Sequence, residues 1–355
     1  MTKALDFGSV KLKHLALHKV GNKIQEEDLE LSDFELEVEE NSPLHKSLMA
    51  YFLKPFREGG YYHFTDESED LNLNEMFGFS RRLFNDPFEQ FMPQSREIAK
   101  HLYNTSTHPN IKGGEFYVAY LEDCIVDGEV VNAIGLFKTE NKEKFLKVKD
   151  QKTGAWAIVQ DEGANVKKLD KGCLIFNFEE EKGFKICLKD SPSKNVEAQY
   201  WKESFLRLKK REDSFFHTQN YLNICKEFVE DVFNEEHNVE RPQQMDMLNR
   251  SMKFFTENED FNIVEFENSV MEEPEVIDAF QEYKDQYKEK NEVPVFDEFK
   301  ISSTAVKKSR KDFKSVIKLD KKIQINVAGN EEHIEKGFDD EKGMSYYIVY
   351  YNEEE

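Results

Sequence analysis

The stretch Lys112–Lys149, KGGEFYVAYLEDCIVDGEVVNAIGLFKTENKEKFLKVK, decides the fold of the larger part of the chain. It holds three short runs of aromatic and β-branched residues, Phe116–Leu121, Val130–Phe137 and Phe145–Val148, a composition typical of strands. Asp127-Gly128 separates the first two runs and tolerates the positive φ of a tight hairpin turn. We therefore expect an antiparallel meander, whose open face the neighbouring segments must cover.

The composition indicates a soluble protein with two domains. A chain of 355 residues is too long for one ordinary core, and its 30 Phe and 14 Tyr offset an apolar content of only 39%. No apolar run approaches the ~20 residues of a transmembrane helix. The first residues, MTKALDFGSVKLKH, lack the apolar segment of a secretory signal. We expect a cytoplasmic protein with no membrane partner.

The apolar spacing changes near Tyr200. Before that point, short runs such as Cys173–Phe178 and Phe184–Leu188 predict further strands. After it, apolar residues recur at helical spacing over about eight turns, which predicts a long helix or a kinked pair. We therefore expect an antiparallel-sheet α+β domain over residues 1–198 and a helix-rich domain over residues 199–355.

The end of the chain reverts to strands and turns. Phe313–Leu319 and Ile323–Val327 flank Asp320-Lys321-Lys322 and predict a basic hairpin. A short helix is expected over Asn330–Lys336, with Asn330 as its N-cap, followed by a Tyr-rich strand over Met344–Tyr351. The fold class predicted is α+β, with a mostly antiparallel sheet domain first and a helix-rich domain with a C-terminal hairpin and strand second.

Signals of enzymatic chemistry are weak throughout. The sequence has no G-x-G-x-x-G, no P-loop and no nucleophile elbow. The four Cys form no C-x-x-C pair, and His14 and His18 have zinc-like spacing only on a helix, whereas their context favours a strand. Asp339-Asp340-Glu341 lacks the ligand spacing of a calcium loop and is best explained as a solvated turn. We predict no catalytic residue, no metal and no cofactor.

Two basic clusters stand out against a formal net charge of −22. The first, which we call the C-terminal cluster, has eight basic residues against Asp312 and Asp320, a net charge of +6. The second, the central cluster, lies in the expected long helix. The C-terminal cluster comprises Lys307, Lys308, Arg310, Lys311, Lys314, Lys318, Lys321 and Lys322, and the central cluster comprises Arg207, Lys209, Lys210 and Arg211.

These clusters have two explanations. Lys314 and Lys318 alternate with Val316 in the expected strand, so they could line one face at a spacing suited to phosphates. If about five charges engage phosphates, the logarithm of the affinity should fall with the logarithm of salt at a slope of roughly −4 to −5. The alternative is a solvated loop and strand edge, where lysines also block aggregation.

Several stretches together resemble the bacterial nucleoid-associated protein family of the NdpA-like type. They are Leu17-His18-Lys19-Val20-Gly21-Asn22-Lys23, Phe116–Tyr120 with Leu136–Lys138, Asp170-Lys171-Gly172-Cys173, Phe313–Leu319, Gly329-Asn330 and Glu335–Met344. The tail is the most specific part, and the likeness spans almost the whole chain in order. The resemblance implies association with the nucleoid and DNA binding without marked sequence preference. It brings no catalytic residues.

Two hypotheses follow. The first is a non-enzymatic nucleoid protein that binds duplex DNA directly, mainly through Lys307–Lys322 and with help from Arg207–Arg211. The second is a protein-interaction module that reaches the nucleoid through other nucleoid proteins, using the acidic helices expected over residues 235–300. Residues 201–300 carry a net charge of −12, which supports the second hypothesis and repels DNA at long range.

Overall fold

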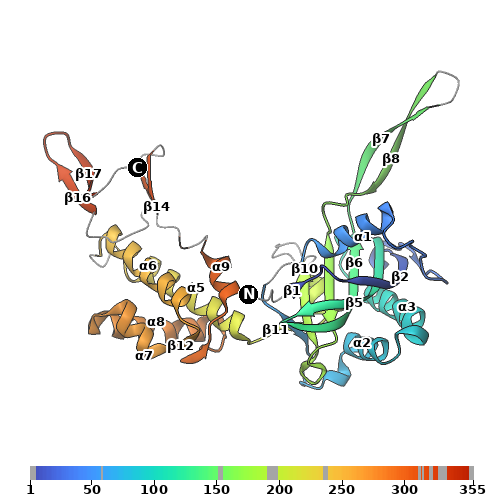
Figure 1. The fold of residues 1–355 in the computed structure, drawn as a ribbon, viewed down its shortest axis with the longest axis horizontal. Coiled ribbons are helices and arrows are strands. Elements are labelled where there is room, and N and C mark those ends of the chain that lie inside the picture. The colour runs from blue at the N-terminus through green and yellow to red at the C-terminus, as the bar shows by residue number, and fades with distance from the viewer. Residues whose placement is uncertain are drawn as a thin grey trace. The chain divides into compact units, whose positions relative to one another are not determined.

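The computed structural model describes residues 5–56, 59–150, 155–189, 199–234, 239–310, 313, 316–319, 323–326 and 334–351. The chain divides into two compact units, Met1–Arg211 and Glu212–Glu355 (Figure 1). Both units mix helices and strands, and the first is built on a large antiparallel sheet. These features confirm the predicted α+β class.

The sheet of the first unit has nine strands in the order β11-β4-β10-β9-β6-β5-β2-β3, with β1 paired to β5. Every pairing in it is antiparallel. The strands are β1 Leu5–Asp6, β2 Lys11–Val20, β3 Leu29–Glu30, β4 Tyr62–Phe64, β5 Gly114–Val126, β6 Glu129–Thr139, β9 Lys171–Phe176, β10 Lys185–Lys189 and β11 Leu208–Lys210.

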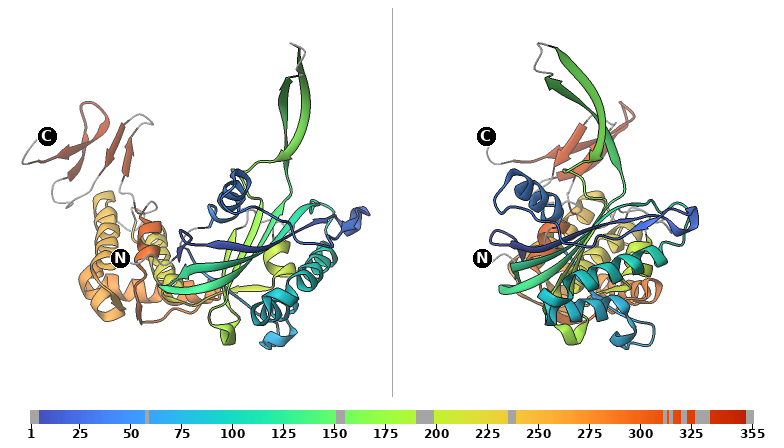
Figure 2. Two further views of the ribbon diagram at one scale, coloured as in Figure 1. Left: turned by 45° about the vertical axis from the view of Figure 1, so that its right-hand side comes forward. Right: turned by 90° about the vertical axis from the view of Figure 1, so that its right-hand side faces the viewer.

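Helices cover both faces of this sheet (Figure 2). Side chains alternate along β5, so Phe116 and Val118 face the helices α2 (Glu75–Asn85) and α3 (Pro87–Thr105). Ala119 and Leu121 face the helix α1 (Pro43–Leu53) on the other side. The sheet is therefore the middle layer of a three-layer unit.

The local sequence sets where these helices begin. Ser42 caps α1 by accepting a hydrogen bond from the His45 N–H at 3.1 Å, and Pro43 occupies the first turn. Asn74 caps α2 in the same way, from the Phe77 N–H at 3.1 Å. Asp86 caps α3, which Pro87 opens. Each of these three helices therefore begins at a residue whose side chain caps it.

The expected meander forms only in part. β5 and β6 pair as predicted, but β7 (Lys142–Asp150) pairs with β8 (Trp156–Ala164) in a separate two-stranded sheet. The free side of β6 pairs instead with β9, which brings in Ala133↔Phe176 and Leu136↔Cys173. Because β9 is buried along its whole length and β7 is exposed along its whole length, pairing with β9 adds to the core and pairing with β7 would not.

The long helix expected from Tyr200 is interrupted. A short helical turn at Trp201–Phe205 buries its aromatic side chains against the first unit's core, and β11 then pairs with β4. Only after Asp213, the N-cap of α5 (Ser214–Asp231), does a long helix begin. Residues 199–211 therefore pack with the first unit, whereas the sequence predicted a boundary between residues 198 and 199.

The second unit is a group of helices around an aromatic core. The helices are α5, α6 (Arg241–Glu257), α7 (Ile263–Phe266), α8 (Pro274–Asn291) and α9 (Ser303–Ser309). Phe228, Phe255, Phe261 and Phe280 are nearly or fully buried in that core. A small sheet of β12 (Asp260–Asn262) and β13 (Glu298–Lys300) joins the helices.

Two hairpins end the described chain. β14 (Val316–Leu319) and β15 (Ile323–Asn326) pair antiparallel, which confirms the predicted hairpin. β16 (Ile334–Asp339) pairs with β17 (Met344–Val349), which is the predicted Tyr-rich strand. The helix predicted over Asn330–Lys336 is wrong from Ile334 onward, since those residues form β16, and its first residues lie outside the described part.

Candidate nucleic-acid interface

The central cluster lies on strand β11 and the turns beside it, and the expected helix is absent there. Arg207 has a left-handed backbone with φ of 50°. Its guanidinium donates hydrogen bonds to Asp66 at 2.8 Å, to the Leu73 carbonyl at 2.5 Å and to Glu75. The charge of Arg207 is therefore balanced within the fold.

Arg211 is more buried than Arg207, and its charge is also paired within the fold. Its side chain is 9% exposed and pairs with Glu179, and it also donates to the Phe184 carbonyl at 3.3 Å. Lys209 and Lys210, by contrast, are exposed on β11, at the edge of the sheet. Of the central cluster, the two lysines are thus the members that face solvent.

The C-terminal cluster begins at the end of helix α9. Lys307 and Lys308 lie in its last turn and Arg310 is its C-cap, and all three are exposed. Cations at this end of a helix are stabilised by the carbonyl dipoles that point toward them. The Lys308 ammonium also lies 5.4 Å from the ring centroid of Phe215 on α5. Three positive charges therefore gather at one exposed helix end.

The rest of the C-terminal cluster is only partly described. Lys318 lies on β14 opposite Gln324, and the structure describes its backbone alone. The remaining members, Lys311, Lys314, Lys321 and Lys322, lie outside the described residues.

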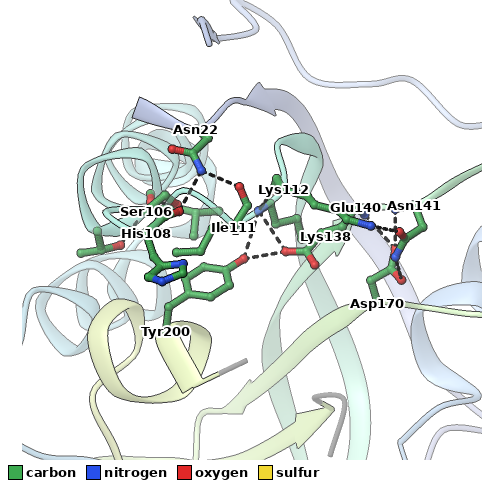
Figure 3. Close-up of polar contacts among 12 residues, drawn as sticks. Asn22, Ser106, His108, Ile111, Lys112, Lys138, Glu140, Asn141, Asp170 and Tyr200 are labelled. Carbon is green, nitrogen blue, oxygen red and sulfur yellow. Dashed lines mark hydrogen bonds and ion pairs between the residues drawn. The ribbon is translucent and has the colours of Figure 1, made fainter. Parts of the chain in front are cut away.

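A buried lysine that sequence reasoning missed lies at the end of β6. Lys138 is 1% exposed, and its ammonium donates to the Lys112 carbonyl at 2.6 Å, to Tyr200 Oη at 3.0 Å and to Glu140 Oε1 at 3.1 Å (Figure 3). The Tyr200 hydroxyl in turn donates to Glu140 at 2.7 Å. Burial lowers the pKa of Lys138, and the Glu140 carboxylate opposes this shift.

The hydrogen bonds of Lys138 stabilise the fold and leave its ammonium no donor for a ligand. An ammonium has three N–H donors, and all three of Lys138 have an acceptor inside the fold. Asp170 extends the network, because it accepts the backbone N–H groups of Glu140 and Asn141 at 2.8 and 3.0 Å. The cluster joins Tyr200 to the sheet. The one sequence feature that could have indicated burial of Lys138 is the apolar run Ile-Gly-Leu-Phe directly before it.

The stretches that carry the family resemblance have structural roles as well. Asn22 is fully buried, caps the turn at Lys23–Gln25 and donates to the Ile111 carbonyl at 2.6 Å. At Gly172 a Cβ would lie 2.7 Å from Leu169. Asp339 accepts the backbone N–H groups of Glu341 and Lys342, and Gly343 has φ of +60°, which closes the turn of the last hairpin.

The His, Cys, Asp and Glu side chains bear on possible chemistry. Among the described residues, His, Cys, Asp and Glu side chains form no group that could hold a metal ion. All four Cys are buried, and burial raises the pKa of the Cys225 thiol to about 12, which keeps it protonated. In the same part of the chain, no helix is long and apolar enough to cross a membrane.

Similarity to a known protein family defines the class of protein. A family model described as nucleoid-associated protein matches residues 16–352, almost the whole chain. The particular family is that of nucleoid-associated protein YejK, and the chain belongs to it. The resemblance seen in the sequence is thereby confirmed, and membership assigns the protein to the bacterial nucleoid. The family description names no enzymatic activity. No curated protein matches the chain significantly.

Proposed function

We propose that the protein binds duplex DNA directly and without sequence preference, through phosphate contacts made by the C-terminal cluster. The observation that carries this proposal is the exposed group of Lys307, Lys308 and Arg310 at the end of α9. Exposed cations that are not enclosed by carboxylates can release condensed counterions from DNA, and this release supplies most of nonspecific affinity. The protein acts without catalysis in this role.

The central cluster makes a smaller contribution in this proposal. Arg207 and Arg211 are held by carboxylates of their own unit, so a phosphate would have to displace Asp66 or Glu179. Lys209 and Lys210 are exposed and add two charges at the edge strand. The C-terminal cluster therefore supplies most of the contacts, including those from Lys311, Lys314, Lys318, Lys321 and Lys322.

A paired charge reversal tests the proposal. The double variant Lys307→Glu with Lys308→Glu should weaken binding to a duplex by about tenfold or more, equally for unrelated sequences. The matched control is Lys288→Glu with Lys290→Glu, which makes the same charge change in the last turn of α8. Equal losses in both variants would mean that net charge alone governs binding, and the proposed interface would be wrong.

A second candidate function is recruitment through a protein partner. The acidic residues on the exposed side of α8 recur at spacings of three and four, and so form one stripe along the helix. They are Glu275, Asp278, Glu282, Asp285 and Glu289. Such a stripe suits a basic protein surface. Recovery of nucleoid proteins with this chain after complete nuclease digestion, and its loss when the stripe is neutralised, would favour this function over direct DNA binding.

A further inference from the structure

Strands β7 and β8 form an arm that extends away from the rest of the first unit (Figures 1 and 2). Every residue of β7 is exposed, and most of β8 is. At the base, the Lys142 ammonium pairs with Glu115 on β5 at 2.6 Å, and Asn165 donates to Glu143 at 2.8 Å between the ends of the two strands. A two-stranded ribbon of this kind is marginally stable in water and gains stability from any surface that covers it.

One side of the arm is apolar. Val148 lies directly opposite Ile158, with Leu146 one step toward the base and Trp156 one step toward the tip. These four side chains share one face, which we call the apolar arm face, and they are 60%, 70%, 69% and 72% exposed, respectively. The opposite face carries Phe145 and Val159 among charged residues, and these two side chains are less exposed, at 48% and 39%. Exposed apolar surface concentrated on one face marks an interaction site.

The charges identify the partner that this face suits. The whole chain has a net charge of −22, so two copies repel each other over most of their surface. The two strands of the arm carry four Lys and four acidic residues, a net charge of zero. The arm is therefore a place where two copies can approach with little repulsion.

The apolar arm face is also self-complementary in charge. Lys142, Lys144 and Glu162 give its base a net charge of +1, and Asp150 gives its tip a charge of −1. When two such faces stack in opposite directions about Val148 and Ile158, the Leu146–Gln160 pair of each copy meets the Asp150–Trp156 pair of the other. The same stacking brings each Asp150 toward Lys144 of the other copy. A two-fold contact of this type satisfies both copies equally.

We propose that the apolar arm face is a dimerisation surface that binds the same face of a second copy in antiparallel orientation. Nine residues per strand give a face about 30 Å long, so the contact is at the small end of specific interfaces. The dimer is therefore concentration-dependent. DNA suits this face less well, because a phosphate backbone demands a net positive surface.

Sedimentation velocity of the full chain, from about 1 to 100 µM, tests this proposal with two matched variants. Val148→Lys puts a charge on the apolar arm face and should weaken dimerisation by about tenfold or more. Val159→Lys makes the same change on the opposite face and should leave the dimer intact. A chain that stays monomeric throughout, or a dimer that Val148→Lys does not weaken, overturns the proposal.

Trp156 gives a second readout that does not depend on a variant. The chain has two Trp, and Trp201 is fully buried, so acrylamide quenching reports on Trp156. Quenching should fall as the concentration passes through the dimerisation range. Constant quenching alongside dimerisation would place the contact elsewhere and contradict the proposal.

The orientation and the identity of the partner are tested separately. Asp150→Asn should weaken the dimer, because it removes an attraction to Lys144 of the other copy. In a parallel stack the same change would relieve repulsion between two Asp150 side chains, so a tighter dimer refutes the antiparallel arrangement. If Val148→Lys alters duplex binding while the oligomeric state is unchanged, DNA is the partner and the proposal is wrong.

Discussion

The two basic clusters look alike in the sequence, but the arginines of one and the described lysines of the other have different surroundings in the structure. The arginines of the central cluster are enclosed by Asp66, Glu75 and Glu179 of the same unit. Lys307 and Lys308 of the C-terminal cluster are exposed at a helix end. The difference teaches that a basic residue serves stability or binding according to the carboxylates that the fold brings to it. Those partners are remote in sequence, at separations of 141, 132 and 32 residues.

The largest effect on stability is expected at Arg211. Arg211→Met keeps most of the side-chain volume but removes the bonds to Glu179 and to the Phe184 carbonyl. We expect the free energy of unfolding to fall by about 2–3 kcal/mol. Urea denaturation measures this. A loss below about 0.5 kcal/mol would show that this arginine is not a structural residue.

Two substitutions at Arg207 distinguish the contribution of its ion pairs to stability from the cost of its left-handed backbone. Arg207→Ala loses the contacts to Asp66 and Glu75 and should cost about 1–2 kcal/mol of unfolding free energy. Arg207→Gly loses the same contacts but relieves the left-handed φ of 50°, so it should be more stable than the Ala variant by about 1 kcal/mol. The two variants are compared by thermal denaturation, and an Ala variant as stable as the Gly variant would argue against backbone strain.

The central cluster also predicts an acid dependence. Burial, with Arg211 and Lys209 nearby, lowers the pKa of His63 below its ordinary 6.5. The unfolded chain then binds the proton more readily, so this stability is present above pH 6.5 and is lost as the pH falls below it. His63→Gln should reduce that loss in urea denaturation at a series of pH values. An unchanged pH profile would contradict the assignment.

The smallest effect on stability is expected in the C-terminal cluster. Lys307→Ala removes an exposed side chain in the last turn of α9 and should change the free energy of unfolding by less than about 0.5 kcal/mol. Its effect should instead fall on DNA binding, where Arg211→Met should have little. If Lys307→Ala lowers the free energy of unfolding and Arg211→Met weakens duplex binding, the contrast between the two clusters is wrong.

The sequence was most informative where local chemistry decides the structure. The Asp127-Gly128 turn and the hairpin of β14 and β15 follow from residues close in the chain. The pairing of β6 with β9 instead of β7 does not follow from nearby residues, because it depends on which distant strand is more apolar. Apolar spacing after Tyr200 also misled, since buried aromatics in a short turn, followed by Leu208 in a strand, can mimic helical spacing.

For the candidate site, the sequence identified where the positive charges are but not which of them are neutralised. Nothing near Lys138 indicates that its three acceptors come from Lys112, Glu140 and Tyr200. In the same way, the exposed lysines at the end of α9 cannot be told from the paired arginines beside β11 without the fold. Pairing of charges over long separations is a property of tertiary structure.

The central claim, direct binding of DNA phosphates by the C-terminal cluster, is tested most directly by a salt titration of duplex affinity. With about five phosphates engaged, the logarithm of the affinity should fall with the logarithm of salt at a slope of roughly −4 to −5, and Lys307→Glu with Lys308→Glu should make that slope shallower by roughly 2. Absent binding at about 50 mM salt, or a slope that the double variant leaves unchanged, would contradict the account.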